Sequence, residues 1–147
     1  MSRLDAQLRF ILEIDRLKGI ARRTYISDGT RRENAAEHSW HFALALLVLG
    51  EYAADARVDL FRAVKLALVH DIVEIEAGDT YVYDAAAQET RLERERSAAA
   101  RLFGLLPPDQ EAEFRAYWEE YEAGETPEAR FAAAMDRLCP VLLNAHG

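Results

Sequence analysis

Four polar residues stand in otherwise apolar stretches of this sequence and could bind a metal ion together. They are His38, His70, Asp71 and Asp136. Burying an imidazole or a carboxylate without a partner is costly, and two of each suit a divalent ion such as Mn, Co, Fe or Zn. Such a set leaves coordination positions for water and a substrate oxygen. A histidine on an apolar helix is more often a hydrogen-bonded core residue, so these residues alone leave both interpretations open.

The stretch Asp59–Asp79 concentrates the groups that could do chemistry. Its apolar run predicts a nearly enclosed helix that ends near Gly78. His70 and Asp71 are adjacent in it, and Glu74 follows three and four residues later. On a continuous helix this spacing puts Glu74 on the face of both residues. Asp79 is then expected to begin the next loop.

The elements that must position these residues are predicted to be helices. Apolar residues recur at helical spacing, and no segment alternates convincingly as a strand does. Asn34 and Glu37 predict a capping box, and Pro140 is expected to kink or end the last helix. We therefore predict an all-α, compact bundle of about six helices, with an irregular connection over residues 21–33. The predicted helices cover residues 4–18, 34–54, 59–78, 88–103, 109–122 and 126 onward.

Composition narrows the class of protein. Half of the 147 residues are hydrophobic, and no run of about 18 apolar residues predicts a membrane span. Cys139 is the single cysteine, which excludes an internal disulfide and favours the cytoplasm. The net charge of −8 argues against binding a nucleic acid polymer. A locally basic segment, Arg16–Arg32, instead suggests a small anionic ligand.

The order of the four candidate ligands resembles a known family. His38, then His70-Asp71, then Asp136, spread over three predicted helices, is similar to the HD-domain metal-dependent phosphohydrolases. The local sequences Glu33-Asn34-Ala35-Ala36-Glu37-His38-Ser39, His70-Asp71-Ile72-Val73-Glu74 and Gly78-Asp79 are similar to the bacterial 5′-deoxynucleotidase branch and its eukaryotic relatives. The resemblance covers nearly the whole chain. It implies a single HD domain over residues 1–147, with a short closing helix of that fold left out.

The resemblance also implies roles for particular residues. His38, His70, Asp71 and Asp136 match the metal ligands of the family. Glu74 and Asp79 match acidic residues implicated in catalysis, which act on the attacking water or the leaving oxygen. An arginine that meets the phosphate is expected at Arg23, or at Arg22 with a shift of one residue.

The chain departs from the nucleotidase pattern in two places. The tryptophan expected after the phosphate-binding arginine is replaced by Thr24 and Tyr25. The proline and lysine expected soon after Asp79 are absent, since the chain continues as residues 80–84, Thr-Tyr-Val-Tyr-Asp. These departures leave the metal and the hydrolysis in place and leave the preference for deoxynucleotides open.

Other residues are assigned structural roles at this stage. For His41, core packing or a bond to a metal ligand is preferred over a place among the ligands. Tyr117, Trp118 and Tyr121 lie at helical spacing and are expected in the core or at a dimer face. Cys139 has no neighbour in the sequence that would activate a thiolate.

The sequence therefore predicts a metal-dependent phosphomonoesterase that releases orthophosphate from nucleoside or deoxynucleoside 5′-monophosphates. In this hypothesis Glu74 handles the proton and Asp79 positions water or substrate. Two alternatives stay open: a phosphodiesterase or pyrophosphohydrolase acting on a signalling nucleotide, and a catalytically silent metal-binding regulatory domain. The family resemblance favours a homodimer.

Overall fold

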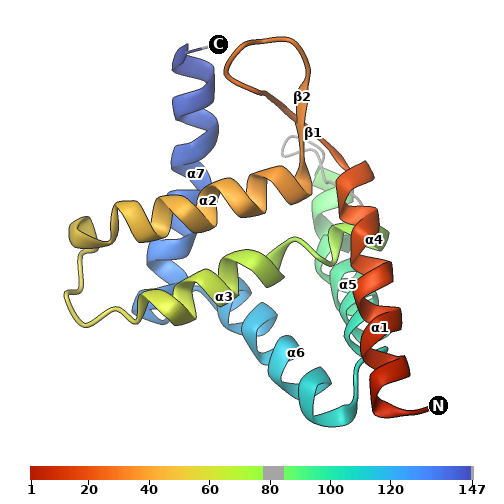
Figure 1. The fold of residues 1–147 in the computed structure, drawn as a ribbon. Helices are drawn as coiled ribbons and strands as arrows, with labels where there is room; N and C mark the ends of the chain where they lie inside the picture. The colour runs from red at the N-terminus through yellow and green to blue at the C-terminus, as the bar shows by residue number, and fades with distance from the viewer. Residues whose placement is uncertain (78–84, 147) are drawn as a thin grey trace.

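The computed structural model describes residues 1–77 and 85–146, and the side chains of all of these except residues 85–89. Helices dominate it, as predicted, and the prediction of an all-α fold is confirmed (Figure 1). Within the described residues there are six helices of eleven residues or more, one single-turn helix, two 3₁₀ turns and a two-stranded hairpin. In chain order these elements are α1 Arg3–Ile14, η1 Asp15–Gly19, β1 Ala21–Tyr25, β2 Arg32–Asn34, α2 Ala35–Val48, η2 Gly50–Tyr52, α3 Leu60–His70, α4 Glu74–Ala77, α5 Ala85–Phe103, α6 Pro108–Ala123 and α7 Pro127–His146.

Helix ends were the best-predicted local feature. The Asn34 side chain accepts a hydrogen bond from the Glu37 N–H, and the Glu37 carboxylate accepts one from the Asn34 N–H, which completes the predicted capping box of α2. Asp59 is the N-cap of α3, and its side chain accepts a hydrogen bond from the Arg62 N–H. Gly124 ends α6 with a φ of 64°, a left-handed conformation that costs glycine little.

The segment predicted as an irregular connection is a β-hairpin instead. β1 and β2 pair antiparallel, with Ala21 opposite Asn34 and Tyr25 opposite Arg32. Gly29 lies in the turn at a φ of 73°, and Asp28 accepts a hydrogen bond from the Thr30 N–H at 2.9 Å. The strands are too short to show the alternation on which a strand prediction depends.

The predicted helix over residues 59–78 is also wrong in part, because α3 ends at His70. Asp71 is its C-cap, and residues 71–73 form a tight turn before the single-turn helix α4. In that turn the Ile72 N–H donates to the Val69 carbonyl and the Glu74 N–H to the Asp71 carbonyl, three residues back rather than four. The apolar pattern continues past the end of α3, because Ile72, Val73 and Ile75 are all buried. The pattern therefore does not indicate that the helix ends at His70.

Pro140 does not end the last helix, although an end there was one of the two outcomes predicted for it. α7 continues through it to His146. A proline has no N–H to donate to the carbonyl four residues earlier, here that of Asp136, and such a position costs a helix about 3 kcal/mol. Packing of α7 against α2 and α3 offsets this cost.

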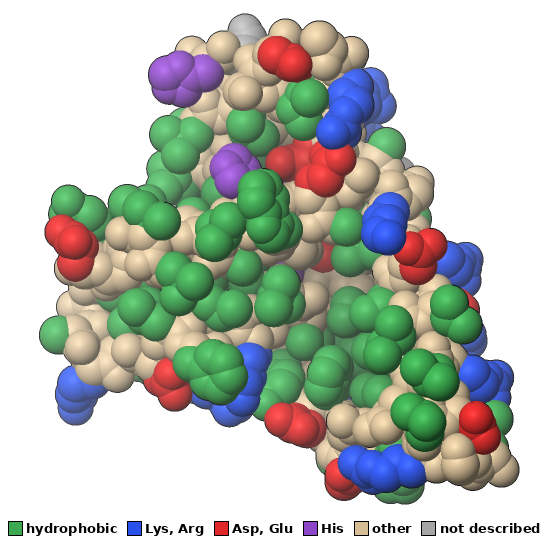
Figure 2. Space-filling view, in the orientation of Figure 1, with side chains coloured by type: hydrophobic (Ala, Val, Ile, Leu, Met, Phe, Trp, Pro, Cys, Tyr) green, Lys and Arg blue, Asp and Glu red, His purple; other side chains and the backbone are tan. Residues whose placement is uncertain are grey.

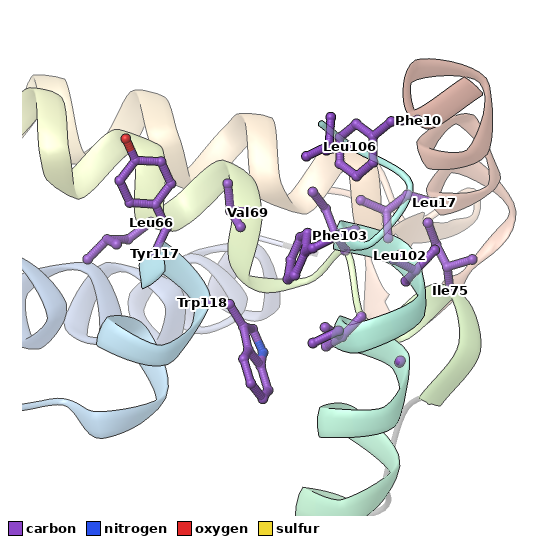
Figure 3. Packing of buried hydrophobic residues seen from close by; sticks show 14 of the residues in the cluster. Phe10, Leu17, Leu66, Val69, Ile75, Leu102, Phe103, Leu106, Tyr117 and Trp118 are labelled. Carbon is purple, nitrogen blue, oxygen red and sulfur yellow. The ribbon is translucent and has the colours of Figure 1, made fainter. Parts of the chain in front are cut away.

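The buried side chains form two clusters that meet at α3. One joins α1, α5 and α6 to one side of α3, with Phe10, Leu66, Phe103 and Trp118 among its members (Figure 3). The other joins α2, α3 and α7 around Phe42 and Leu46. α2, α3 and α7 pack on one another, so residues far apart in the sequence meet between them. None of the described helices is long and apolar enough to cross a membrane.

Candidate metal centre

The structure brings the four predicted ligands together where α2, α3 and α7 meet. His38 lies on the first turn of α2, His70 is the last residue of α3, Asp71 follows it, and Asp136 lies on α7. Ligand atoms of His38, His70 and Asp71 all lie within 4.8 Å of one another. Asp136 Oδ1 completes the group at 2.5 Å from His38 Nε2. We call these four residues the metal cluster.

The backbone of α3 orients His70. Its Nδ1 lies 2.7 Å from the Ala67 carbonyl oxygen, which can only accept a hydrogen bond, so Nδ1 carries the proton. Nε2 is then left with a lone pair, and it lies 3.1 Å from Asp71 Oδ1. A hydrogen bond from one ring nitrogen to a carbonyl is the usual way in which a protein holds a metal-binding histidine in the correct tautomer.

His38 is held by a packed ring and a carboxylate. It is fully buried, and the Phe42 ring stacks on it with 5.4 Å between ring centroids. Its Nδ1 faces Glu33 Oε1 at 3.6 Å, while its Nε2 points at Asp136. Glu33 is itself buried, so each ring nitrogen of His38 has a carboxylate beside it. Binding of a metal at Nε2 would require this nitrogen to be deprotonated.

Asp136 receives a second donor that the sequence did not reveal. The Tyr121 hydroxyl donates to Asp136 Oδ2 at 2.8 Å, and the Tyr121 ring lies 4.6 Å from that of His70. Burial opposes ionisation of Asp136, but the hydrogen bond from His38, the positive charges of the two histidines and the bond from Tyr121 together hold its pKa well below the usual range. Burial, followed by the charge of Asp136, raises the pKa of Tyr121, so the phenol keeps its proton.

The alternation of β1 separates the two arginines that were candidates for binding phosphate. Arg22 is half-buried, with Nη1 at 3.6 Å from Asp71 Oδ2 and Nε at 3.3 Å from Glu33 Oε1. Arg23 is exposed on the opposite face of the strand. The structure therefore places Arg22, rather than the preferred Arg23, beside the metal cluster.

The remaining candidate residues differ in their surroundings. Glu74 begins α4, three residues after Asp71, and one of its carboxylate oxygens is enclosed. Asp79 lies outside the described residues. His41 lies against Trp40, with 6.0 Å between ring centroids, and lines a surface hollow with Arg31 and Glu37, so it is in neither the core nor the metal cluster. Cys139 is buried, which raises the pKa of its thiol to about 11 and agrees with the expected structural role.

The donors and charges of the cluster fit a divalent cation. Asp71, Asp136 and Glu33 bring three carboxylates together, and Arg22 is the positive side chain that the described contacts place against them. Asp71 Oδ2 is buried and has no hydrogen-bond partner. A buried carboxylate oxygen without a donor is costly unless a cation compensates it. Donors that each lie about 2.1 Å from one ion are at most about 4.2 Å apart, so the ligand atoms of His38, His70 and Asp71, which lie within 4.8 Å of one another, would need to move only slightly to meet on one ion.

Comparison with known proteins agrees with the resemblance found in the sequence. Residues 14–147 match the family described as HD domain. The chain is 32% identical over 139 residues to the human protein named 5′-deoxynucleotidase HDDC2, and 29% identical over 144 residues to the zebrafish protein of the same name. These alignments cover 94% and 97% of this chain. The chain spans 66% of the human relative and 70% of the zebrafish one.

A solved structure has nearly the same fold. The protein from Magnetospirillum magnetotacticum MS-1, described as a predicted metal-dependent phosphohydrolase, is 58% identical and superposes with a TM-score of 0.92. The match covers 99% of this chain and 72% of that one. The identity and the fold similarity are both high, so the arrangement of α2, α3 and α7 around the cluster is one that a solved protein also adopts.

Proposed function

The chain belongs to the HD domain family, and from that premise we propose that it is a metal-dependent phosphomonoesterase that releases orthophosphate from nucleoside 5′-monophosphates, deoxynucleotides among them. The observation that supports this most directly is the convergence of His38, His70, Asp71 and Asp136 on one point between α2, α3 and α7. The names of the human and zebrafish relatives support the nucleotide as substrate. The described site has no cysteine or serine placed as a nucleophile against a base, so water is the proposed attacking group.

The four residues of the metal cluster would hold one divalent ion, with Mn, Co, Fe and Zn as the candidates. When bound, such an ion neutralises phosphate charge and makes water more acidic. His70 presents Nε2 because Ala67 fixes its other nitrogen, and Tyr121 fixes one oxygen of Asp136, so the other faces the ion. Both side chains are therefore held in place before any ligand arrives, which lowers the cost of organising the site.

Glu74 is the proposed general base. It begins α4 three residues after Asp71, and one of its carboxylate oxygens is buried. A carboxylate there can take the proton of an attacking water, and proton transfer of this kind contributes about 10²- to 10⁴-fold to a rate. Asp79 is proposed to position the water or the leaving oxygen, as the family resemblance implies.

Arg22 is the proposed phosphate-binding side chain. Its guanidinium already lies 3.6 Å from Asp71 and is the cation nearest to the cluster among the described contacts. A guanidinium can donate two parallel hydrogen bonds to a phosphate. Arg22→Met should raise the KM for nucleotides by about 10- to 100-fold, the value of a hydrogen bond to a charged group. Arg23→Met removes the same charge from the opposite face of β1 and should change KM little; a larger effect at Arg23 would reverse this assignment.

The decisive experiment is phosphate release from ribo- and deoxyribonucleoside 5′-monophosphates, after removal of metal and return of Mn, Co, Fe, Zn or Mg. We expect release that depends on the metal. Release only from a dinucleotide or a nucleoside polyphosphate would favour a phosphodiesterase or pyrophosphohydrolase. Bound metal and bound nucleotide without release from any of these would favour a regulatory domain and contradict the proposed activity.

We also propose that the chain works as a homodimer in the cytoplasm, as one domain. Apolar side chains gather on one face formed by α1, α2 and α3 (Figure 2), and we call it the apolar face. Exposed apolar patches of this kind mark interaction sites in soluble proteins. The exposed apolar side chains of these three helices include Leu4, Leu8, Ile11, Leu12, Trp40, Leu47, Val48 and Phe61.

The oligomeric state can be measured by light scattering during size exclusion. A dimer should show twice the chain mass of 16.7 kDa, and Leu47→Glu should shift it toward the monomer because the charge would be buried at the interface. Glu51→Gln, just beyond the end of the same helix, is the control, because Glu51 is not one of the apolar side chains of this face. A monomer at all concentrations would contradict the proposal.

A further inference from the structure

A cleft between α5 and α6 has polar groups that the metal cluster does not use. Its volume is about 580 Å³. α6 lines it with Arg115, Trp118, Glu119 and Glu122, and α5 lines it with Arg91 and Arg96. Pockets for small ligands measure about 300–1,000 Å³, so this cleft can enclose a molecule of the size of a nucleoside.

The innermost polar group of the cleft has no partner. The Trp118 side chain is 4% exposed, and its indole N–H finds no acceptor. Figure 3 shows its ring between α6 and α5, with the nitrogen on the edge turned toward α5. The Nε–H of Arg115, on the same wall, also lacks an acceptor. A buried donor left unsatisfied costs about 1–3 kcal/mol, so these two groups call for an oxygen or nitrogen acceptor from a ligand.

The charges of the cleft favour a neutral polar ligand over a simple anion. Arg91 forms an ion pair with the buried carboxylate of Glu95, with 3.1 Å between Arg91 Nη1 and Glu95 Oε1. Arg96 and Arg115 line the cleft together with Glu119 and Glu122, and Arg115 also lies 3.7 Å from Glu111, so the cations of the cleft have carboxylates close by. Donors and acceptors side by side suit a group that carries both, such as a nucleobase with its sugar hydroxyls.

The cleft adjoins the metal cluster through one turn of α6. Glu122 follows Tyr121, whose hydroxyl bonds Asp136 and whose ring lies against His70. On the other wall, burial raises the pKa of Glu95, and the negative charges of Glu122 and then Asp71 raise it further. The charge on Glu95 is therefore influenced both by a residue of the cleft and by a residue of the cluster.

We infer that the cleft between α5 and α6 binds the nucleoside part of the substrate, while the phosphate reaches the metal cluster. The identity of the ligand rests on the proposed function, whereas the binding itself does not require turnover. The Trp118 N–H and the Arg96 and Arg115 guanidinium groups donate to acceptors of the base, and Glu122, near the cluster, accepts from a sugar hydroxyl. The cleft thus acts on the affinity for the nucleoside and leaves the chemical step to the cluster.

Binding can be measured without catalysis because Trp118 is one of only two tryptophans. Trp40, the other, is 62% exposed on α2 and does not line the cleft, so a Trp40→Phe background leaves Trp118 as the only indole reporter. In metal-free protein, titration with each of the four 2′-deoxynucleosides should change Trp118 fluorescence. Arg96→Met should weaken this binding by about 10- to 100-fold, the value of one hydrogen bond to a charged group. Arg9→Met, which removes an exposed arginine from α1, is the matched control.

Kinetic measurements on two substrates, one with a base and one without, distinguish an effect on the cleft from an effect on the metal cluster. Trp118→Phe keeps an apolar ring and removes the N–H, so it should raise KM for nucleoside 5′-monophosphates by about three- to tenfold. Hydrolysis of 2-deoxyribose 5-phosphate, which has no base, should be unchanged by the same substitution. Equal losses on both substrates would show a defect of folding or of the cluster, and would overturn the inference.

The two proposals fail in different ways. If nucleosides change Trp118 fluorescence and Arg96→Met weakens the effect, but no nucleotide is hydrolysed, the cleft assignment stands and the proposed activity falls. If nucleotides are hydrolysed, Arg96→Met changes neither KM nor the fluorescence titration, and Trp118→Phe leaves KM unchanged, the activity stands and the cleft assignment is wrong.

Discussion

Asp136 in the metal cluster and Glu95 behind the cleft are two carboxylates in enclosed positions whose ionisation is shifted in opposite directions. The Asp136 side chain is 27% exposed and its pKa is held low. Glu95 is 4% exposed, and burial raises its pKa. Asp136 accepts hydrogen bonds from His38 and Tyr121, whereas Glu95 meets Arg91 alone, with Glu122 nearby as a like charge.

The contrast shows that donors, and not burial alone, decide which carboxylate stays charged. A site that must hold a cation needs an ionised carboxylate, and the fold supplies the donors for it from two different helices, α2 and α6. The cleft lacks such complete pairing, since Trp118 and Arg115 keep unused N–H groups. One region is arranged around a charge, and the other around hydrogen bonds that a ligand has yet to complete. Each prediction below tests one side of this difference.

The largest effect is expected from Asp71→Ala. This change removes the carboxylate beside His70, so metal content and phosphate release should fall together, the latter by about a thousandfold or more. Metal content is measured by mass spectrometry of the purified protein. His41→Ala is the matched control, because this histidine lies on the same helix as His38 and outside the cluster. Retention of metal in Asp71→Ala would contradict the assigned ligand set.

A smaller but still large effect is expected from Glu74→Gln. The amide keeps the shape of the side chain but cannot take a proton, so turnover should fall by about 10²- to 10⁴-fold while metal content is unchanged. The two measurements are phosphate release under saturating nucleotide and metal content. Loss of metal in this variant would make Glu74 a ligand and not a general base.

Tyr121→Phe tests the donor that holds Asp136. The ring stays against His70, and only the hydroxyl that donates at 2.8 Å is lost. Removal of a group that orients a ligand typically weakens metal binding by about 10- to 100-fold. Competition with a chromophoric chelator measures this affinity directly. Tyr117→Phe, on the same helix, removes a hydroxyl that bonds Glu113 and should leave the affinity unchanged.

The smallest effect concerns the pH dependence of stability at Glu95. The pKa of Glu95 is raised in the folded protein. The contribution of Glu95 to the free energy of unfolding is therefore most favourable at pH values below the pKa that it has in the unfolded chain. This contribution is lost as the pH rises through the pKa that it has in the folded protein. Glu95→Gln removes this loss. The free energy of unfolding of Glu95→Gln, measured in urea and compared with that of the unchanged protein at the same pH, should therefore increase from pH 4 to pH 8. A difference that stays constant over this range would show that Arg91 fully compensates the charge.

Local features of this protein could be predicted from the sequence because their causes lie within a few residues. The Asn34–Glu37 capping box, the Asp59 cap and the stop at Gly124 each depend on groups that are at most four residues apart. The order of His38, His70-Asp71 and Asp136 was also informative, since its resemblance to the HD-domain family implied that three helices would converge. In the structure His38, His70 and Asp71 form one group, and Asp136 lies against His38.

Other features were decided only by the tertiary structure. α3 ends at His70 although the apolar pattern continues, because Ile72 and Val73 are buried whether the backbone is helical or turned. The choice between Arg22 and Arg23 depends on the face of β1 that meets the cluster, and a sequence does not reveal which face is inward in a strand this short.

The sequence by itself determined the helical class, the helix caps and the residue types that can bind a cation. The tertiary structure decided which groups surround them: Tyr121 as the donor to Asp136, Glu33 beside His38, Arg22 beside Asp71, and the cleft with the unpaired Trp118 N–H. The physical reason is sequence distance. A cap is a hydrogen bond within one turn, whereas Tyr121 and Asp136 come from different helices and meet only after α6 and α7 have packed.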